Sequence, residues 1–226
     1  MEKAIEKLGI YDLIGIIAPG IISTLCILYL CPDLLSYFKS LLCDKRILDC
    51  FFIGVSYIIG LALHEIGSVA ERKWLLKNGE PHEIFLNPDA NIIENKTEFE
   101  LFSNTIKQVL KELGFKHHNP TPSNEEVRMA FHYCQVINEM NGRNIKSDRI
   151  DSLHCMSRAL FVFFFAAFVL YSSSVLIFQY PERGKVALVN VLLLLFITLV
   201  MYRRTLGLAK YQVKSVVRNY IASKSK

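Results

Sequence analysis

The sequence has none of the short motifs that mark the common catalytic and nucleotide-binding folds. It contains no Walker phosphate loop, no GxSxG nucleophile elbow and no GxGxxG dinucleotide loop. His64 and Glu65 begin like the HExxH motif of zinc proteases, but Ser68 stands where the second histidine is needed. We therefore expect a protein that is not an enzyme and needs no cofactor, and we assign no catalytic residue.

Cysteine and histidine are too scattered for a disulfide framework or a metal site. Of the six cysteines, Cys26 falls in an apolar stretch, and we place Cys134 and Cys155 on the reducing side of a membrane. Whether two of the three cysteines Cys31, Cys43 and Cys50 form a disulfide is left open. The six histidines show no spacing typical of zinc ligands, so no metal site is predicted.

Charge is missing from long stretches of the chain. Residues 159–180 and 186–202 are uncharged and, as helices, would extend about 33 Å and about 26 Å, against a hydrocarbon core of about 30 Å. Because a short connection separates them, they should form an antiparallel hairpin at 158–203. The N-terminal half, residues 1–70, holds two further candidate spans: an uncharged one at 13–32, and one at 50–70 that His64 and Glu65 interrupt. The sequence thus predicts an all-α integral membrane protein with four transmembrane helices.

Polar segments lie around and between these spans. Residues 33–49 place leucines on one face, which predicts a helix on the membrane surface. Residues 71–157 contain two capping boxes, Thr97 with Glu100 and Ser123 with Glu126, followed by helical patterns that end at Gly114 and Gly142. Ser147 is a candidate cap for the helix that enters the third span. We expect a small helical domain inserted between spans two and three.

Acidic residues are absent from the last segment, residues 203–226, which carries seven Lys or Arg. Lys210, Lys214 and Arg218 lie opposite an apolar face, so residues 204–226 are predicted to form a basic amphipathic helix on anionic headgroups. Lys and Arg near span ends concentrate on the side of the N-terminus, the inserted domain and this tail. The opposite side has only Lys39, Lys45, Arg46, Arg183 and Lys185. The positive-inside rule then places both termini and the domain in the cytoplasm.

Basic residues of the inserted domain are candidates for ligand binding. Arg128 and His132 share a helix face, and Arg143, Lys146 and Arg149 cluster at the start of the helix that enters the third span. Guanidinium groups and a helix N-terminus suit phosphate. The alternative is a solvated face together with the positive-inside signal.

Polar residues within the spans are candidates for a pore or gate. Ser173 and Asn190 should lie at similar depth in the hairpin, and Asp12, His64 and Glu65 should lie near the cytoplasmic end. The alternatives are interhelical hydrogen bonds for the first pair and a headgroup position for His64 and Glu65.

Small residues mark a packing face on the second span. Ser56, Gly60 and Gly67 recur at helical spacing, which lets helix backbones approach closely. The contact could lie within one protomer or between protomers.

The segments YDLIGIIAPG at 11–20 and GLALHEIGSVAER at 60–72, with the final hairpin, resemble a loose group of bacterial four-span membrane proteins with a YDLxGxxxPG opening. Some of these resemble effectors of anti-phage defence, including Hailong-type systems, in which a partner nucleotidyltransferase makes a product that triggers membrane disruption. The resemblance implies a gated membrane effector that responds to a nucleotide messenger. We expect it to form a homo-oligomer in the bacterial inner membrane and not to bind nucleic acid directly. The alternative is a non-conducting scaffold in the lipid bilayer that docks a protein partner through its domain or tail.

Overall fold

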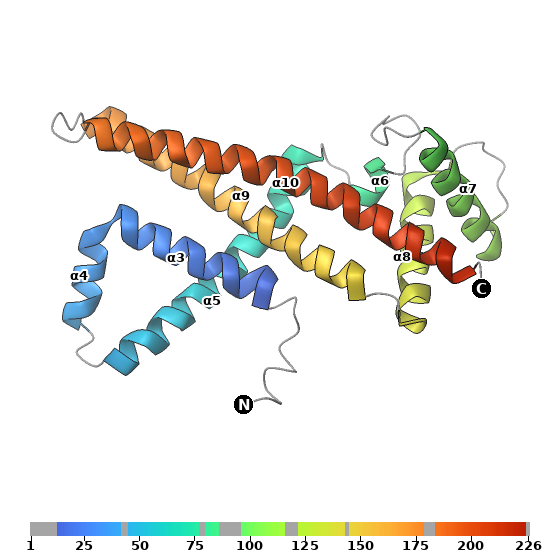
Figure 1. Ribbon diagram of the computed structural model, residues 1–226, viewed down its shortest axis with the longest axis horizontal. Coiled ribbons are helices and arrows are strands. Elements are labelled where there is room, and N and C mark those ends of the chain that lie inside the picture. Colours follow the sequence, from blue (N-terminus) through green and yellow to red (C-terminus); the bar gives the residue numbers. More distant parts are fainter. Residues whose placement is uncertain are drawn as a thin grey trace. The chain divides into compact units, whose positions relative to one another are not determined.

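The computed structural model describes residues 13–41, 45–76, 80–85, 96–115, 122–142, 145–178 and 184–224. Within these ranges every regular element is a helix (Figure 1), which confirms the all-α class. Four helices there are long and apolar enough to cross a membrane: Leu13–Leu30, Arg46–Leu75, Ser147–Leu176 and Lys185–Lys224. This arrangement is compatible with the multi-pass membrane protein that the sequence predicts.

The first two candidate spans are joined through a short helix. The π-helix η1 (Leu13–Ile17) leads into α3 (Ala18–Leu30), and Pro19 falls in the first turn of α3. Then follow α4 (Pro32–Leu41), α5 (Lys45–Ala70) and the π-helix η2 (Glu71–Leu75). The predicted surface helix at 33–49 is therefore divided, because its last residues already belong to α5.

The chain divides into two compact units. Unit 1 comprises Met1–Glu71 and Ser152–Thr205, and unit 2 comprises Arg72–Asp151 and Leu206–Lys226. The helices α9 (Ile145–Phe178) and α10 (Gly184–Lys224) each contribute residues to both units. The predicted boundaries at 157 and 204 thus fall inside continuous helices.

Unit 1 has a small apolar core and a largely apolar surface. The core is formed by Leu63, Ala159, Leu160, Phe163, Phe164 and Leu194. Many large apolar side chains, among them Leu170, Leu176 and Phe196, are more than half exposed. An apolar surface of this extent needs a cover other than water, and lipid hydrocarbon would supply it.

Unit 2 contains α6 (Pro81–Phe85), α7 (Lys96–Glu112) and α8 (Asn124–Met140). The predicted capping box of α8 is confirmed: Ser123 Oγ accepts from the Glu126 N–H, and the Glu126 carboxylate accepts from the Ser123 N–H at 2.7 Å. Gly114 and Gly142 follow α7 and α8 with φ of 86° and 63°, which favours glycine. Thr97, in contrast, lies inside the first turn of α7, because this helix already begins at Lys96.

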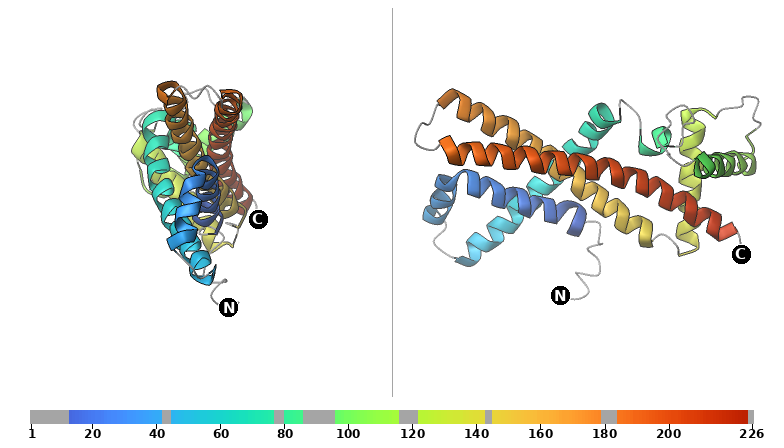
Figure 2. Two further views of the ribbon diagram at one scale, coloured as in Figure 1. Left: turned by 90° about the vertical axis from the view of Figure 1, so that its left-hand side faces the viewer. Right: turned by 45° about the horizontal axis from the view of Figure 1, so that its top comes forward.

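The C-terminal part of α10 belongs to the core of unit 2. Val213, Val216, Val217 and Tyr220 are buried together with Phe102, Ile106, Val109 and Leu110 of α7 and with Val127, Phe131 and Cys134 of α8. Figure 2 shows this part of α10 beside α7 and α8. Asn138 also donates a hydrogen bond from Nδ2 to the Val216 carbonyl at 2.9 Å. The predicted amphipathic helix exists, but its apolar face is covered by protein and is not free to lie on headgroups.

Candidate functional site

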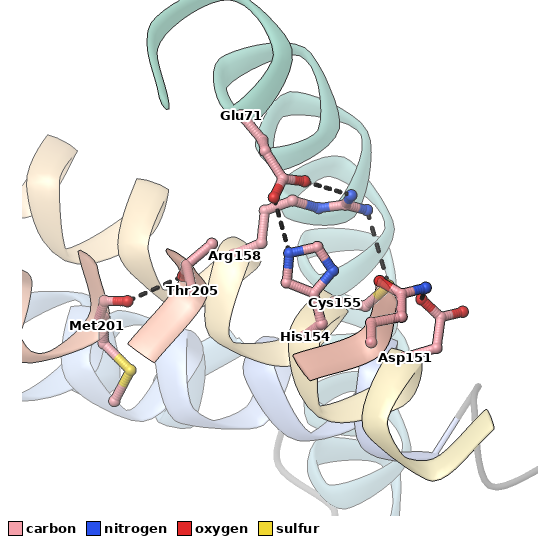
Figure 3. Close-up of polar contacts among 8 residues, drawn as sticks. Glu71, Asp151, His154, Cys155, Arg158, Met201 and Thr205 are labelled. Carbon is pink, nitrogen blue, oxygen red and sulfur yellow. Dashed lines mark hydrogen bonds and ion pairs between the residues drawn. The ribbon is translucent and has the colours of Figure 1, made fainter. Parts of the chain in front are cut away.

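A buried cluster of ionisable side chains, formed by Glu71, His154 and Arg158, is the most concentrated such set in the described part of unit 1. Glu71 begins η2, while His154 and Arg158 lie one turn apart on α9 and so face the same side. Nε2–H of His154 donates to Glu71 Oε1 at 2.7 Å, and Arg158 Nη1 donates to Oε2 at 3.0 Å (Figure 3). The side chains are only 3%, 3% and 12% exposed for Glu71, His154 and Arg158.

Gly67 makes room for this cluster one turn before Glu71. A Cβ atom on Gly67 would lie 3.1 Å from Cγ of Arg158, which is tighter than an ordinary van der Waals contact. Both oxygens of the Glu71 carboxylate already accept a donor, so the group is suited to fixing helices in place. These two contacts join the end of the second candidate span to α9. Removing one partner would leave a buried charge uncompensated, so the cluster resists the loss of either side chain.

The small residues of the second span pack within the chain. A Cβ atom on Gly60 would lie 2.1 Å from the Ile16 carbonyl oxygen, and one on Gly20 would lie 1.9 Å from that of Ser56. Ser56 Oγ also donates to Thr24 Oγ1 at 3.1 Å. Of the two alternatives for the stripe of Ser56, Gly60 and Gly67, these contacts favour the one within a protomer.

The predicted pore residues are only partly brought together. Across the hairpin, Asn190 Nδ2 donates to the hydroxyl of Tyr171 at 3.2 Å. Ser173 does not join this contact, because its hydroxyl donates to the Val169 carbonyl of its own helix at 2.8 Å. His64 is half-buried and Glu65 is exposed, while Asp12 lies outside the described residues.

The predicted ligand residues do not form one site among those that the structure describes. Arg128 is exposed, with Nη2 4.0 Å from Glu80 Oε1, and the Nδ1 of His132 lies 3.0 Å from Gln135 Oε1. Arg149 is exposed on α9. Arg143 and the side chain of Lys146 lie outside the description.

A buried histidine lies beside this part of α8. His82 of α6 stacks on Phe131 with ring centroids 4.8 Å apart. Burial lowers the pKa of its imidazole below the ordinary value, although the charges of Glu80 and Glu83 act in the opposite direction. The surroundings of His82 therefore favour its neutral form. No periodic pattern marks this residue in the sequence, because α6 is too short to show one.

Two acidic residues of α7 bind the basic side of α10, and sequence reasoning missed both. The Glu98 carboxylate accepts from Lys214 Nζ and Arg218 Nη2, each at 2.6 Å. Glu112, at the other end of α7, accepts from Tyr220 Oη at 3.2 Å and from Lys224 Nζ. Burial acts to raise the pKa of Glu98, but the hydrogen bonds and charges of Lys214 and Arg218 outweigh it and lower the pKa. The spacing of Lys214 and Arg218 on one helix face was the available signal.

Comparison with protein-family models, with curated proteins and with solved structures finds no match for this chain. The functional assignment therefore depends on the geometry of the chain itself and on the resemblance of its short motifs.

Proposed function

We propose that the protein is a homo-oligomeric membrane effector of bacterial anti-phage defence. In this proposal, unit 2 binds a nucleotide-type anion, and the spans respond by opening an ion path or by disrupting the bilayer. The four apolar helices cross the inner membrane, and both termini and unit 2 lie in the cytoplasm, as the distribution of Lys and Arg indicates.

One observation carries the gating proposal: α9 and α10 pass between the units without a break. These helices have 34 and 41 residues, and the unit boundaries at Ser152 and Thr205 lie inside them. An unbroken helix keeps its backbone hydrogen bonds across the boundary, so it transmits a displacement far better than a flexible linker. Two of the four candidate spans are therefore direct continuations of helices that build unit 2.

The hairpin supplies the polar element for an ion path. The contact of Asn190 with Tyr171 joins an amide and a phenol across the two helices of the hairpin. The exposed carboxylate of Glu65 would attract cations near the cytoplasmic end. An interhelical hydrogen bond alone would stabilise the hairpin without conducting, so conduction has to be tested directly.

The test follows membrane potential with a dye in bacteria that express the chain with or without a nucleotidyltransferase of the Hailong type. We expect depolarisation only when both proteins are present, and we expect Asn190→Leu to weaken it. Val189→Leu is the matched control, because Val189 is an exposed apolar residue on the same turn. Undiminished depolarisation in Asn190→Leu would remove the proposed path.

The second candidate function is a non-conducting scaffold, and an exposed apolar stripe on α8 favours it. Met129, Val136 and Met140 are all exposed and lie on one face of this helix. Such a stripe on a polar unit suits a protein partner. Loss of function in Met140→Ser, combined with a membrane that stays sealed when the parent protein is activated, would favour the scaffold over the effector.

A further inference from the structure

Lys214 and Arg218 form a two-cation site on α10 that holds the carboxylate of Glu98. Each cation binds a different oxygen: Lys214 Nζ lies 2.6 Å from Oε2 and Arg218 Nη2 lies 2.6 Å from Oε1. The two cations are four residues apart on one continuous helix, which fixes their spacing. Glu98 comes from the first turn of another helix, α7, so it can leave without any change in α10.

The charges of this site suit an anion stronger than a carboxylate. Among the described residues, two cations meet one carboxylate here, whereas a phosphate group carries a charge of about −1.5 to −2 at neutral pH and three acceptor oxygens. The Arg218 side chain is 56% exposed, while those of Lys214 and Glu98 are 19% and 13% exposed. Solvent, and a dissolved anion, therefore reach the site from the side of Arg218.

Release of Glu98 would leave unit 2 folded. The opposite end of α7 is held by Glu112, which binds Tyr220 and Lys224. Between the two ends, Phe102, Ile106 and Leu110 are buried in the same core as Val213 and Val217. An anion could thus replace the Glu98 carboxylate while the apolar contact between α7 and α10 persists.

We infer that Lys214 and Arg218 form an oxyanion-binding site for a phosphate-bearing ligand, and that Glu98 occupies the ligand's place in the resting protein. The ligand is either a dissolved phosphate compound or a lipid headgroup. The inference deepens the proposed function and rests on it for its regulatory meaning, because α10 also forms the fourth candidate span. It assigns phosphate recognition to α10 instead of Arg128, Arg143 and Arg149.

The test is calorimetric titration of pyrophosphate into the full chain in phosphatidylcholine nanodiscs. Glu98→Gln removes the charge of the internal competitor, so we expect it to tighten pyrophosphate binding by roughly tenfold or more. Glu112→Gln is the matched control, because it weakens the other contact between α7 and α10 and leaves Glu98 in place. Replacing both Lys214 and Arg218 by alanine in the Glu98→Gln background should abolish binding.

Several results would overturn the site. These are equal affinities in Glu98→Gln and Glu112→Gln, no binding to Glu98→Gln, or binding that survives the loss of both cations. If Glu98→Gln does not fold, Arg218→Ala is compared with Arg128→Ala in the otherwise unchanged chain. Arg218→Ala must then weaken pyrophosphate binding at least about tenfold and Arg128→Ala must leave it unchanged.

A second set of nanodiscs, containing phosphatidylglycerol, distinguishes the two sources of phosphate. If the ligand is a headgroup, these lipids should remove the part of pyrophosphate binding that depends on Lys214 and Arg218; if it is dissolved, that part should remain. Calorimetry needs no conduction, so the two proposals can fail separately. Pyrophosphate binding without depolarisation would contradict the effector and leave the site in place. Depolarisation that persists after both cations are replaced would contradict the role of the site in gating and leave the effector in place.

Discussion

Gly60 faces the carbonyl oxygen of Ile16 so closely that a Cβ atom on Gly60 would lie 2.1 Å from that oxygen. This oxygen belongs to the backbone and cannot swing aside, so the first two candidate spans must separate if residue 60 gains a side chain. We expect Gly60→Ala to destabilise the protein by about 1–3 kcal/mol, and Gly60→Leu by more.

Thermal unfolding in detergent measures this effect, and Gly54→Ala on the same helix is the control. A Cβ atom on Gly54 meets nothing within 4 Å, so alanine there should be neutral or stabilise by about 0.5–1 kcal/mol through its better helix propensity. Equal stability of the two alanine variants would show that α5 does not touch η1 at this point.

We expect a second large loss of stability when the cluster of Glu71, His154 and Arg158 is broken. Glu71→Ala leaves Arg158 and His154 buried without their carboxylate, which should cost about 3–5 kcal/mol of unfolding free energy. Glu65→Ala removes an exposed carboxylate from the same span and should change little. If Glu71 and Arg158 stabilise the protein through their charges, combining Glu71→Gln with Arg158→Met should recover most of the loss, since the double variant has neither the carboxylate nor the guanidinium. Additive losses in the double variant would contradict this view.

Local sequence predicts the helices, and the sites depend on contacts that local sequence does not contain. Ser123 and Glu126 mark a helix start because their hydrogen bonds span only three residues. Glu71 and Arg158 are 87 residues apart, and Glu98 and Lys214 are 116 apart, so no spacing rule relates them. The apolar face of Val213 and Val217 was predictable from its period, but periodicity does not say whether lipid or protein covers such a face.

Because His82 is buried, we expect unit 2 to lose stability in mild acid. Burial lowers the pKa of His82, helped by the charges of His132 and Arg128 and opposed by those of Glu80 and Glu83. Below the ordinary histidine value of about 6.5 the unfolded chain therefore binds a proton that the folded chain does not, so the unfolding free energy falls as pH falls through this range.

Unfolding temperatures at about pH 7.5 and about pH 5.5 measure this dependence, in a window above the titration of Glu98 and Glu112. His82→Phe keeps the ring stacked on Phe131 and should flatten the dependence, whereas His132→Phe, at an exposed position, should preserve it. If His82→Phe leaves the pH dependence of the unfolding temperature unchanged, groups other than His82 cause the acid sensitivity.

The proposed orientation is tested by cysteine accessibility. In a chain whose six native cysteines are replaced, cysteines introduced at Ser36 and Glu182 should react with an impermeant maleimide in intact cells. A cysteine at Ser123, in unit 2, should react only after the cells are opened. Labelling of Ser123→Cys in intact cells would place unit 2 outside and reverse the orientation.

Val213 distinguishes a tail that completes unit 2 from a tail that lies on the membrane. Its side chain is 2% exposed in the core that contains Phe102 and Val109, whereas Tyr211 on the same helix is 46% exposed. Val213→Asp should cost several kcal/mol because it places a carboxylate in this core, and Tyr211→Asp should cost little. Amide hydrogen exchange of α7 is the informative measurement, since α7 lies at the buried face of α10 and has no part in a tail–lipid contact. Loss of protection in α7 with Val213→Asp, but not with Tyr211→Asp, supports the shared core. Unchanged protection in α7 together with weaker lipid binding would instead indicate that the apolar face of α10 lies on the membrane.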